Sequence, residues 1–169
     1  MSFLRSRTIL LGLYTFGTEE TPNCFGTPPQ SGGTSMGTNS NLLYAAITMG
    51  KAYKYKNDPR YLGFMYDQLN WILGNNPFNI SLMEEQGSAF PTTYHHRYLF
   101  GGVDRGAVPG SVVNGIMWKD YQDDRPYFDM SGVDIPVSST NECWLPHNTN
   151  YLRTLAYLKT IQKQNIFNK

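Results

Sequence analysis

The pair Asp58-Pro59 constrains the fold more than any other feature, because it interrupts a long helical pattern at one point. Proline disfavours a helical conformation at the residue before it and fits the first turn of a new helix. Apolar residues recur at helical spacing over about residues 39–57 and again from Pro59 to Gly74. The pattern predicts two antiparallel helices joined by a tight turn, with Asp58 capping the second helix and Asn39 or Ser40 capping the first.

The remainder of the chain divides into loops and one further helix. Residues 17–38 are dense in Gly, Pro, Thr and Ser, and they predict a long loop or linker. Residues 75–139 show no sustained period, so we expect long loops there, with one short helix near residues 78–84. A last helix is expected over about residues 146–163. Its predicted apolar face consists of Leu152, Leu155, Ala156, Leu158 and Ile161. These patterns predict an all-α fold with long loops at one end.

The composition limits the class of partner. Lys and Arg number 14 and Asp and Glu 13, so the net charge is only +1, and no apolar run approaches the roughly 20 residues that span a bilayer. We therefore expect neither nucleic acid nor a membrane as partner. Charged residues make up 16% of the chain and aromatic residues 14%, which suits uncharged polar ligands such as sugars, although a large aromatic core explains the same composition. Cys24 and Cys143 show no metal spacing, and a single disulfide stays an open alternative.

One short segment, PTTYHHRYLF at residues 91–100, gathers side chains that bind ligands. The side chains in question are Tyr94, His95, His96, Arg97 and Tyr98. A zinc site needs further ligands, and His147 is the only other histidine of the chain. A phosphate site would need a glycine-rich loop that opens a helix, which is missing here. No metal or cofactor is assigned, and contact with a sugar is the favoured interpretation.

Three segments carry a resemblance to a known family. The first spans residues 37–81 and contains LGNNP, the second contains PTTYHHR, and the third is YFDMSGVDIPVSSTNECWLPHNTNYL. In order and spacing they resemble the C-terminal part of the catalytic domain of family 9 glycoside hydrolases, the cellulase family built on an (α/α)6 barrel. The stretch GAVPGSVVNGI, residues 106–116, resembles the loop between the second and third segments. The resemblance covers about residues 23–160.

The resemblance implies that residues 23–169 form the C-terminal part of such a barrel, preceded by a helix remnant and linker at residues 1–22. At about 1.5 Å of rise per residue, a whole barrel needs several hundred residues. The chain is therefore expected to be a fragment that exposes apolar faces. Its expected partners are the N-terminal part of the same barrel, or a complementary chain, and a β-linked oligo- or polysaccharide. A polymeric substrate implies a secreted or periplasmic location.

The resemblance also implies an inverting hydrolase that acts on β-1,4-glucan or a related β-linked chain. Inverting hydrolysis uses one carboxyl group to protonate the leaving oxygen and a second, roughly 6.5–9.5 Å away, to activate water. Glu142 is implied as the proton donor, and Asp129 is implied to orient it or to bind sugar hydroxyls. The family's base belongs to an aspartate pair in an earlier segment. No Asp-Ala-Gly-Asp-like stretch occurs in this sequence, so the chain is expected to hold only the acid half of the site.

The same resemblance implies the residues that bind substrate. His95 and Arg97 would line the sugar subsites beside the cleavage point, because a guanidinium can bind neighbouring hydroxyls with two N–H groups. Tyr94 and Tyr98 would stack on pyranose rings, and Trp144 would form a wall near the acid.

Two alternatives follow from the residues without the resemblance. Ser139-Thr140-Asn141-Glu142 matches a capping box, in which Glu142 binds a backbone amide at a helix start. Asp129 in a polar loop is most often a turn residue. These interpretations favour a non-catalytic carbohydrate-binding module or a purely structural helical domain.

Overall fold

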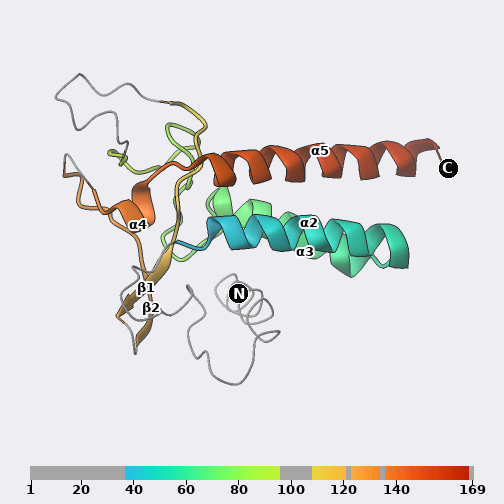
Figure 1. The fold of residues 1–169 in the computed structure, drawn as a ribbon, viewed down its shortest axis with the longest axis horizontal. Coiled ribbons are helices and arrows are strands. Elements are labelled where there is room, and N and C mark those ends of the chain that lie inside the picture. The colour runs from blue at the N-terminus through green and yellow to red at the C-terminus, as the bar shows by residue number, and fades with distance from the viewer. Residues whose placement is uncertain (1–36, 96–107, 121–122, 134–135, 168–169) are drawn as a thin grey trace.

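The structure is a computed structural model, and it describes residues 37–95, 108–120, 123–133 and 136–167. These ranges contain three long helices: α2 (Asn39–Lys56), α3 (Pro59–Ile72) and α5 (Leu145–Phe167). Figure 1 shows them side by side, with the loops, the short helix α4 (Ser138–Asn141) and a hairpin of β1 (Met117–Asp120) and β2 (Asp123–Tyr127) gathered at one end. The predicted helical scaffold with loops at one end is confirmed. The expected helix remnant at residues 1–22 lies outside the described residues.

None of the helices in the described ranges is both long and apolar enough to cross a membrane.

The helical hairpin forms as the sequence predicts. The carboxylate of Asp58 accepts a hydrogen bond from the backbone N–H of Arg60 at 2.9 Å, and Pro59 is the first residue of α3. Asn57 ends α2 in the left-handed region, with φ 53°, a conformation that asparagine tolerates better than most residues. The turn is therefore determined by three consecutive residues, and it packs α2 against α3.

The start of α2 is bonded to a distant loop. Asn39 is the first helical residue, and Thr38 occupies the cap position without a side-chain cap bond, so the prediction that Asn39 or Ser40 caps this helix is wrong. Instead, the N–H of Thr38 donates to the carbonyl of Ile116, and the N–H of Asn39 donates to that of Asn114, both at 3.0 Å. The side-chain amide of Asn39 donates to the carbonyl of Val113 at 2.9 Å. These loop carbonyls satisfy donors that a local cap would otherwise serve.

Residues 78–84 form turns, so the short helix predicted there is wrong. Asn76 donates through its side-chain amide to the carbonyls of Trp71 and Ile80, at 2.8 and 2.7 Å. Asn79 has φ 53°, which interrupts a right-handed helix. A side chain that competes for backbone partners favours a turn over a helix.

The β-hairpin of β1 and β2 is a second difference from the prediction, which expected only loops in this part of the chain. β1 and β2 pair antiparallel, with Met117 opposite Tyr127 and Trp118 opposite Pro126. The two strands are too short and too polar to give the alternating pattern from which a strand is predicted.

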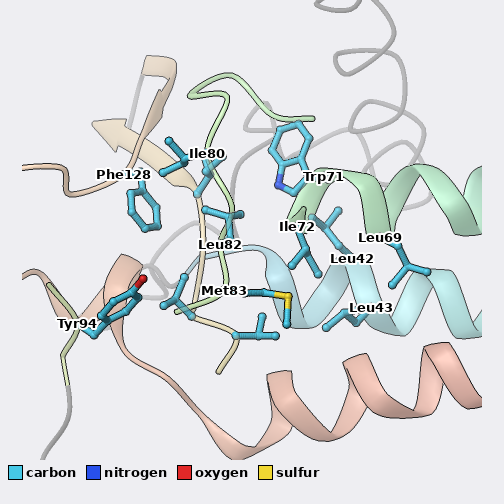
Figure 2. Packing of buried hydrophobic residues seen from close by; sticks show 13 residues of the cluster. Leu42, Leu43, Leu69, Trp71, Ile72, Ile80, Leu82, Met83, Tyr94 and Phe128 are labelled. Carbon is cyan, nitrogen blue, oxygen red and sulfur yellow. The ribbon is translucent and has the colours of Figure 1, made fainter. Parts of the chain in front are cut away.

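The core joins the helices to the loop end. Figure 2 shows Leu42 of α2 and Ile72 of α3 in one cluster with Leu82, Tyr94 and Phe128 from three separate loop segments. A second cluster connects the three long helices through Ala46, Met65, Leu158 and Ile161. The loop segments are therefore anchored by apolar burial, and their positions at the site depend on this core.

The buried face of α5 differs from the predicted one. Leu158 and Ile161 are buried as expected. Leu152 is 65% exposed, and Leu155 and Ala156 are also exposed, so the prediction for these three residues is wrong.

Contacts with α2 and the loops decide which face of α5 is buried. Three polar residues of α5 lie on the buried face: His147, Asn150 and Thr154. The Thr154 hydroxyl donates to the Asn150 carbonyl at 2.7 Å, which satisfies it within the helix. A Cβ atom at Gly50 would lie 2.8 Å from the Tyr157 ring, so the glycine of α2 permits the close approach of α5. Apolar spacing alone could not reveal these contacts.

The difference between the two faces of α5 can be measured with a pair of substitutions in this chain. Leu158→Ala removes a side chain that is 8% exposed, and we expect the free energy of unfolding to fall by about 2–4 kcal/mol. Leu152→Ala removes an exposed side chain, and we expect a loss of no more than about 0.5 kcal/mol. Urea unfolding followed by circular dichroism measures both. Equal losses would contradict the burial described here.

Candidate active site

Four short segments from distant parts of the sequence meet at the loop end of the helices. Three bridged pairs join them: Met83 with Val112, Val113 with Cys143, and His95 with Glu142. The N–H of Asn114 donates to the carbonyl of Glu142 at 2.9 Å, and the N–H of His95 donates to that of Asn141 at 3.1 Å. Because bridged residues project to the same side of the paired strands, His95 and Glu142 share one face.

Glu142 follows α4 directly and is buried, with 8% of its surface exposed. Its N–H donates to the carbonyl of Ser138 at 3.2 Å. Val137 is the cap residue of α4 and has no side-chain cap bond, while Ser139 lies inside this helix. Glu142 thus stands after a helix and not in the first turn of one, so the capping-box interpretation is wrong.

Asp129 is buried and holds two backbone donors. Its carboxylate oxygens accept hydrogen bonds from the N–H of Ser131 at 2.9 Å and from the N–H of Val137 at 2.7 Å. Burial acts to raise the pKa of this carboxyl, but hydrogen bonds from Ser131 and Val137 outweigh it, so the pKa lies below its usual value. Asp129 is therefore an anion that fixes the loop in front of α4.

Asn141 connects the second and third of the predicted motif segments, although sequence analysis did not assign it to the site. It is fully buried. Its side-chain amide donates to the carbonyl of Thr93 at 3.2 Å and to the carbonyl of Asp129 at 3.1 Å. The hydroxyl of Thr140 donates to its side-chain oxygen at 2.6 Å. The available signal was its position directly before Glu142 in the third segment.

Neighbouring residues Tyr94 and His95 have different surroundings. The Tyr94 ring lies in the core (Figure 2), and its hydroxyl accepts from the N–H of Glu85 at 3.3 Å, while burial raises its pKa. Its ring is therefore not presented at the surface. The Nδ1 atom of His95 lies 2.8 Å from the carbonyl of Pro136. Because a carbonyl only accepts, Nδ1–H donates, and Nε2 of the neutral ring is an acceptor.

The remaining predicted site residues are placed only in part. Trp144 is 40% exposed, and its ring stacks on that of His147 with 6.3 Å between centroids and 18° between planes. Arg97 and Tyr98 lie outside the described residues, so their contacts with a sugar stay predictions.

A second buried glutamate, Glu84, lies close to the residue after Glu142. The thiol of Cys143 is 3.9 Å from Oε2 of Glu84. Burial raises the pKa of the Cys143 thiol, and the carboxylates of Glu84 and Glu142 raise it further, so Cys143 is a protonated thiol at neutral pH. In the part of the chain that the structure describes, no three His, Cys, Asp or Glu side chains form a metal-ligand cluster.

This arrangement suits proton transfer to a polar ligand. A buried carboxyl group, Glu142, shares a face with an imidazole of fixed orientation, His95, and an anchored aspartate lies on the neighbouring loop. The backbone bonds hold these groups in a defined geometry, which general acid catalysis requires.

Comparisons with known proteins identify similar chains. The sequence pattern described as Glycosyl hydrolase family 9 matches residues 14–145. A cellulose 1,4-beta-cellobiosidase of Acetivibrio thermocellus is 26% identical over 147 residues, which is 78% of this chain and 16% of that protein.

Two solved structures are also similar. A metagenome-derived glycoside hydrolase family 9 endoglucanase is 23% identical, with a TM-score of 0.61 over 92% of this chain and 27% of that one. The cellulase Cel9M of C. cellulolyticum, in complex with cellobiose, is 26% identical, with a TM-score of 0.53 over 81% of this chain and 32% of that one. The chain thus spans about a third or less of the length of these proteins.

The anchoring of Asp129 predicts a pH-dependent loss of stability. The pKa of Asp129 is lower in the folded chain than its value of 3.8 in the unfolded chain, so the carboxylate stabilises the fold above pH 3.8. This contribution disappears as the pH falls through the pKa of the folded state. Asp129→Asn replaces one acceptor by a donor, and we expect it to lower the free energy of unfolding by about 1–3 kcal/mol at pH 7. The difference from wild type should shrink below pH 3.8. Urea unfolding at several pH values measures this, with the exposed Glu85→Gln as control.

Proposed function

Because the chain belongs to glycosyl hydrolase family 9, we propose that it carries the proton-donor half of an inverting β-glycosidase site, with Glu142 as the general acid. The similar solved structures of this family are (α/α)6 barrels, and the chain has the fold of the C-terminal part of such a barrel. Since the chain spans about a third or less of these proteins, hydrolysis is proposed for this chain together with the rest of such a barrel.

The observation that carries the proposal is the convergence of the second and third motif segments, and of the loop 106–116 between them, at Asn141 and Glu142. His95 pairs with Glu142, and Asn141 donates to the carbonyls of Thr93 and Asp129. Segments that lie far apart in sequence thus bring His95, Asn141 and the buried Glu142 together through backbone and amide bonds. A purely structural helical domain does not require such a gathering, since its core is apolar.

In the proposed reaction, Glu142 donates its proton to the oxygen of the leaving sugar as the glycosidic bond breaks. The Nε2 atom of His95 accepts a hydrogen bond from a sugar hydroxyl near this bond. Asp129 orients the loop before α4, and in this way it helps to orient Glu142, the residue that follows α4. Arg97 binds hydroxyls, and Tyr98 and Trp144 form apolar contacts with pyranose rings. The base that activates water is a carboxylate from outside this chain.

We propose a β-1,4-glucan or a related β-linked saccharide as the substrate. The support comes from relatives named as a cellobiosidase and as a cellulase in complex with cellobiose. Because such a polymer does not enter cells, we further propose that the protein acts outside the cytoplasm.

The exposed leucines of α5 support a protein partner. Leu145, Leu152 and Leu155 are exposed along this helix, and clusters of exposed apolar side chains mark surfaces that another element covers. We propose that the preceding part of a family 9 barrel, or a complementary chain, covers them.

The role of Glu142 can be tested by fusing the chain behind the preceding part of a family 9 domain and following the release of reducing sugar from a β-1,4-glucan. We expect Glu142→Gln to lower kcat by about 10³-fold, because the amide cannot donate a proton to the leaving oxygen. Cellobiose binding, measured by calorimetry, should stay within about threefold of wild type.

Glu85→Gln supplies the matched control, since it makes the same chemical change at an exposed position, and its kcat should not change. If Glu142→Gln kept full activity, another group would be the acid. Sugar binding without hydrolysis by the fused wild type would favour a carbohydrate-binding module, and loss of both would favour a structural domain.

A further inference from the structure

We propose that Asn114 and His147 act as a positioning pair for Glu142 by fixing the main chain on both sides of this residue. The catalytic meaning of the pair rests on the proposed function of Glu142. Its geometry can be tested independently of that function.

Asn114 binds the backbone of Glu142 by two routes. Its own N–H donates to the carbonyl of Glu142 at 2.9 Å. Its side-chain amide donates at 2.7 Å to the carbonyl of Ser138, which also accepts the N–H of Glu142 at 3.2 Å. Asn114 is completely buried, so water cannot replace these bonds. Asn114 thereby holds the peptide group after the Cα of Glu142 directly, and the peptide group before it through the Ser138 carbonyl that both residues share.

His147 holds the side chain of Asn114 in the orientation that makes this possible. Its Nε2 atom hydrogen-bonds the side-chain oxygen of Asn114. Since an amide oxygen only accepts, Nε2–H is the donor, and this fixes both the tautomer of the ring and the amide orientation. The amide nitrogen of Asn114 then faces Ser138. A reversed amide would place an NH₂ group against the Nε2–H donor.

The surroundings of His147 maintain this state. The ring is buried and stacks on Trp144, and its Nδ1 atom has no hydrogen-bond partner among the described residues. Burial lowers the pKa of His147 to about 4. The His147 ring is therefore neutral at pH 7, where it keeps Asn114 oriented.

The pair closes a short loop that contains the proposed acid. Only Cys143 and Trp144 separate Glu142 from α5, and His147 is the third residue of that helix. Asn114 therefore binds both ends of the segment from Glu142 to His147. A general acid displaced by about 1 Å can lose on the order of 10²-fold in rate, so a closed loop of this kind has a direct consequence for catalysis.

The chain offers matched substitutions for a test. His147→Phe keeps a ring against Trp144 but removes the N–H donor, and His147→Gln restores an amide N–H at about the same reach. Asn150→Ala serves as the control, because it changes another buried polar residue of α5 that has no bond to Asn114. None of these substitutions changes Asn148, whose side chain accepts from the N–H of Val112 at 2.9 Å, so we expect α5 to stay attached to the loop.

The first measurement uses the chain itself and does not involve activity. Amide hydrogen exchange is followed by NMR at Asn114, whose N–H bonds Glu142, and at the adjacent Val113, whose N–H bonds Leu82 at 3.1 Å. We expect His147→Phe to accelerate exchange at Asn114 about tenfold or more while Val113 changes little. Equal acceleration at both amides, or none at either, would overturn the positioning pair.

The second measurement uses the fused enzyme described above and separates kcat from KM. His147→Phe should lower kcat by about 10- to 100-fold with KM within about threefold, and His147→Gln should recover most of the loss. Asn150→Ala should leave kcat within about threefold. Equal effects of His147→Phe and Asn150→Ala would show that His147 is merely structural. If the fused wild type hydrolysed no glucan, the proposed function would fail, and the exchange measurement would still decide the geometry.

Discussion

The buried segment from Val112 to Ile116 is the constraint on which the rest of the structure depends. Its peptide groups bond in two directions, toward the start of α2 and toward the residues around α4. Gly115 makes the close packing possible, because it has φ 97° and a Cβ atom there would lie 2.5 Å from the side chain of Asn39. These peptide groups are buried, so each needs a hydrogen-bond partner within the protein. A buried peptide group without a partner costs about 1–3 kcal/mol.

The described contacts that hold the candidate site together are hydrogen bonds of backbone and amide groups. Arg60 and Asp58 form an ion pair at an exposed turn far from Glu142 in sequence. Asn114 and Asn141 instead connect loops by donating to carbonyls. An amide can donate and accept at once without carrying charge, so it satisfies buried backbone groups at lower desolvation cost than a carboxylate or an ammonium group.

Much of the helical scaffold could be predicted because its signals are local. Asp58 and Pro59 specify the turn between α2 and α3 through their own backbone preferences. The apolar face of α5 was predicted only in part. Leu152 has the right spacing but is exposed, whereas His147 is buried because Asn114, far away in sequence, accepts its N–H. Spacing reports which residues share a side of a helix, and it does not report what lies against that side.

The sequence by itself determined the helix pair, the order of the three motif segments and the family to which they point, because each of these is written in neighbouring or regularly spaced residues. Only the tertiary structure decided that Tyr94 enters the core while His95 pairs with Glu142, and that Asn141 joins the motifs. The physical reason is that these positions follow from hydrogen bonds between segments tens of residues apart. Such bonds exist only once the apolar core has brought the segments together.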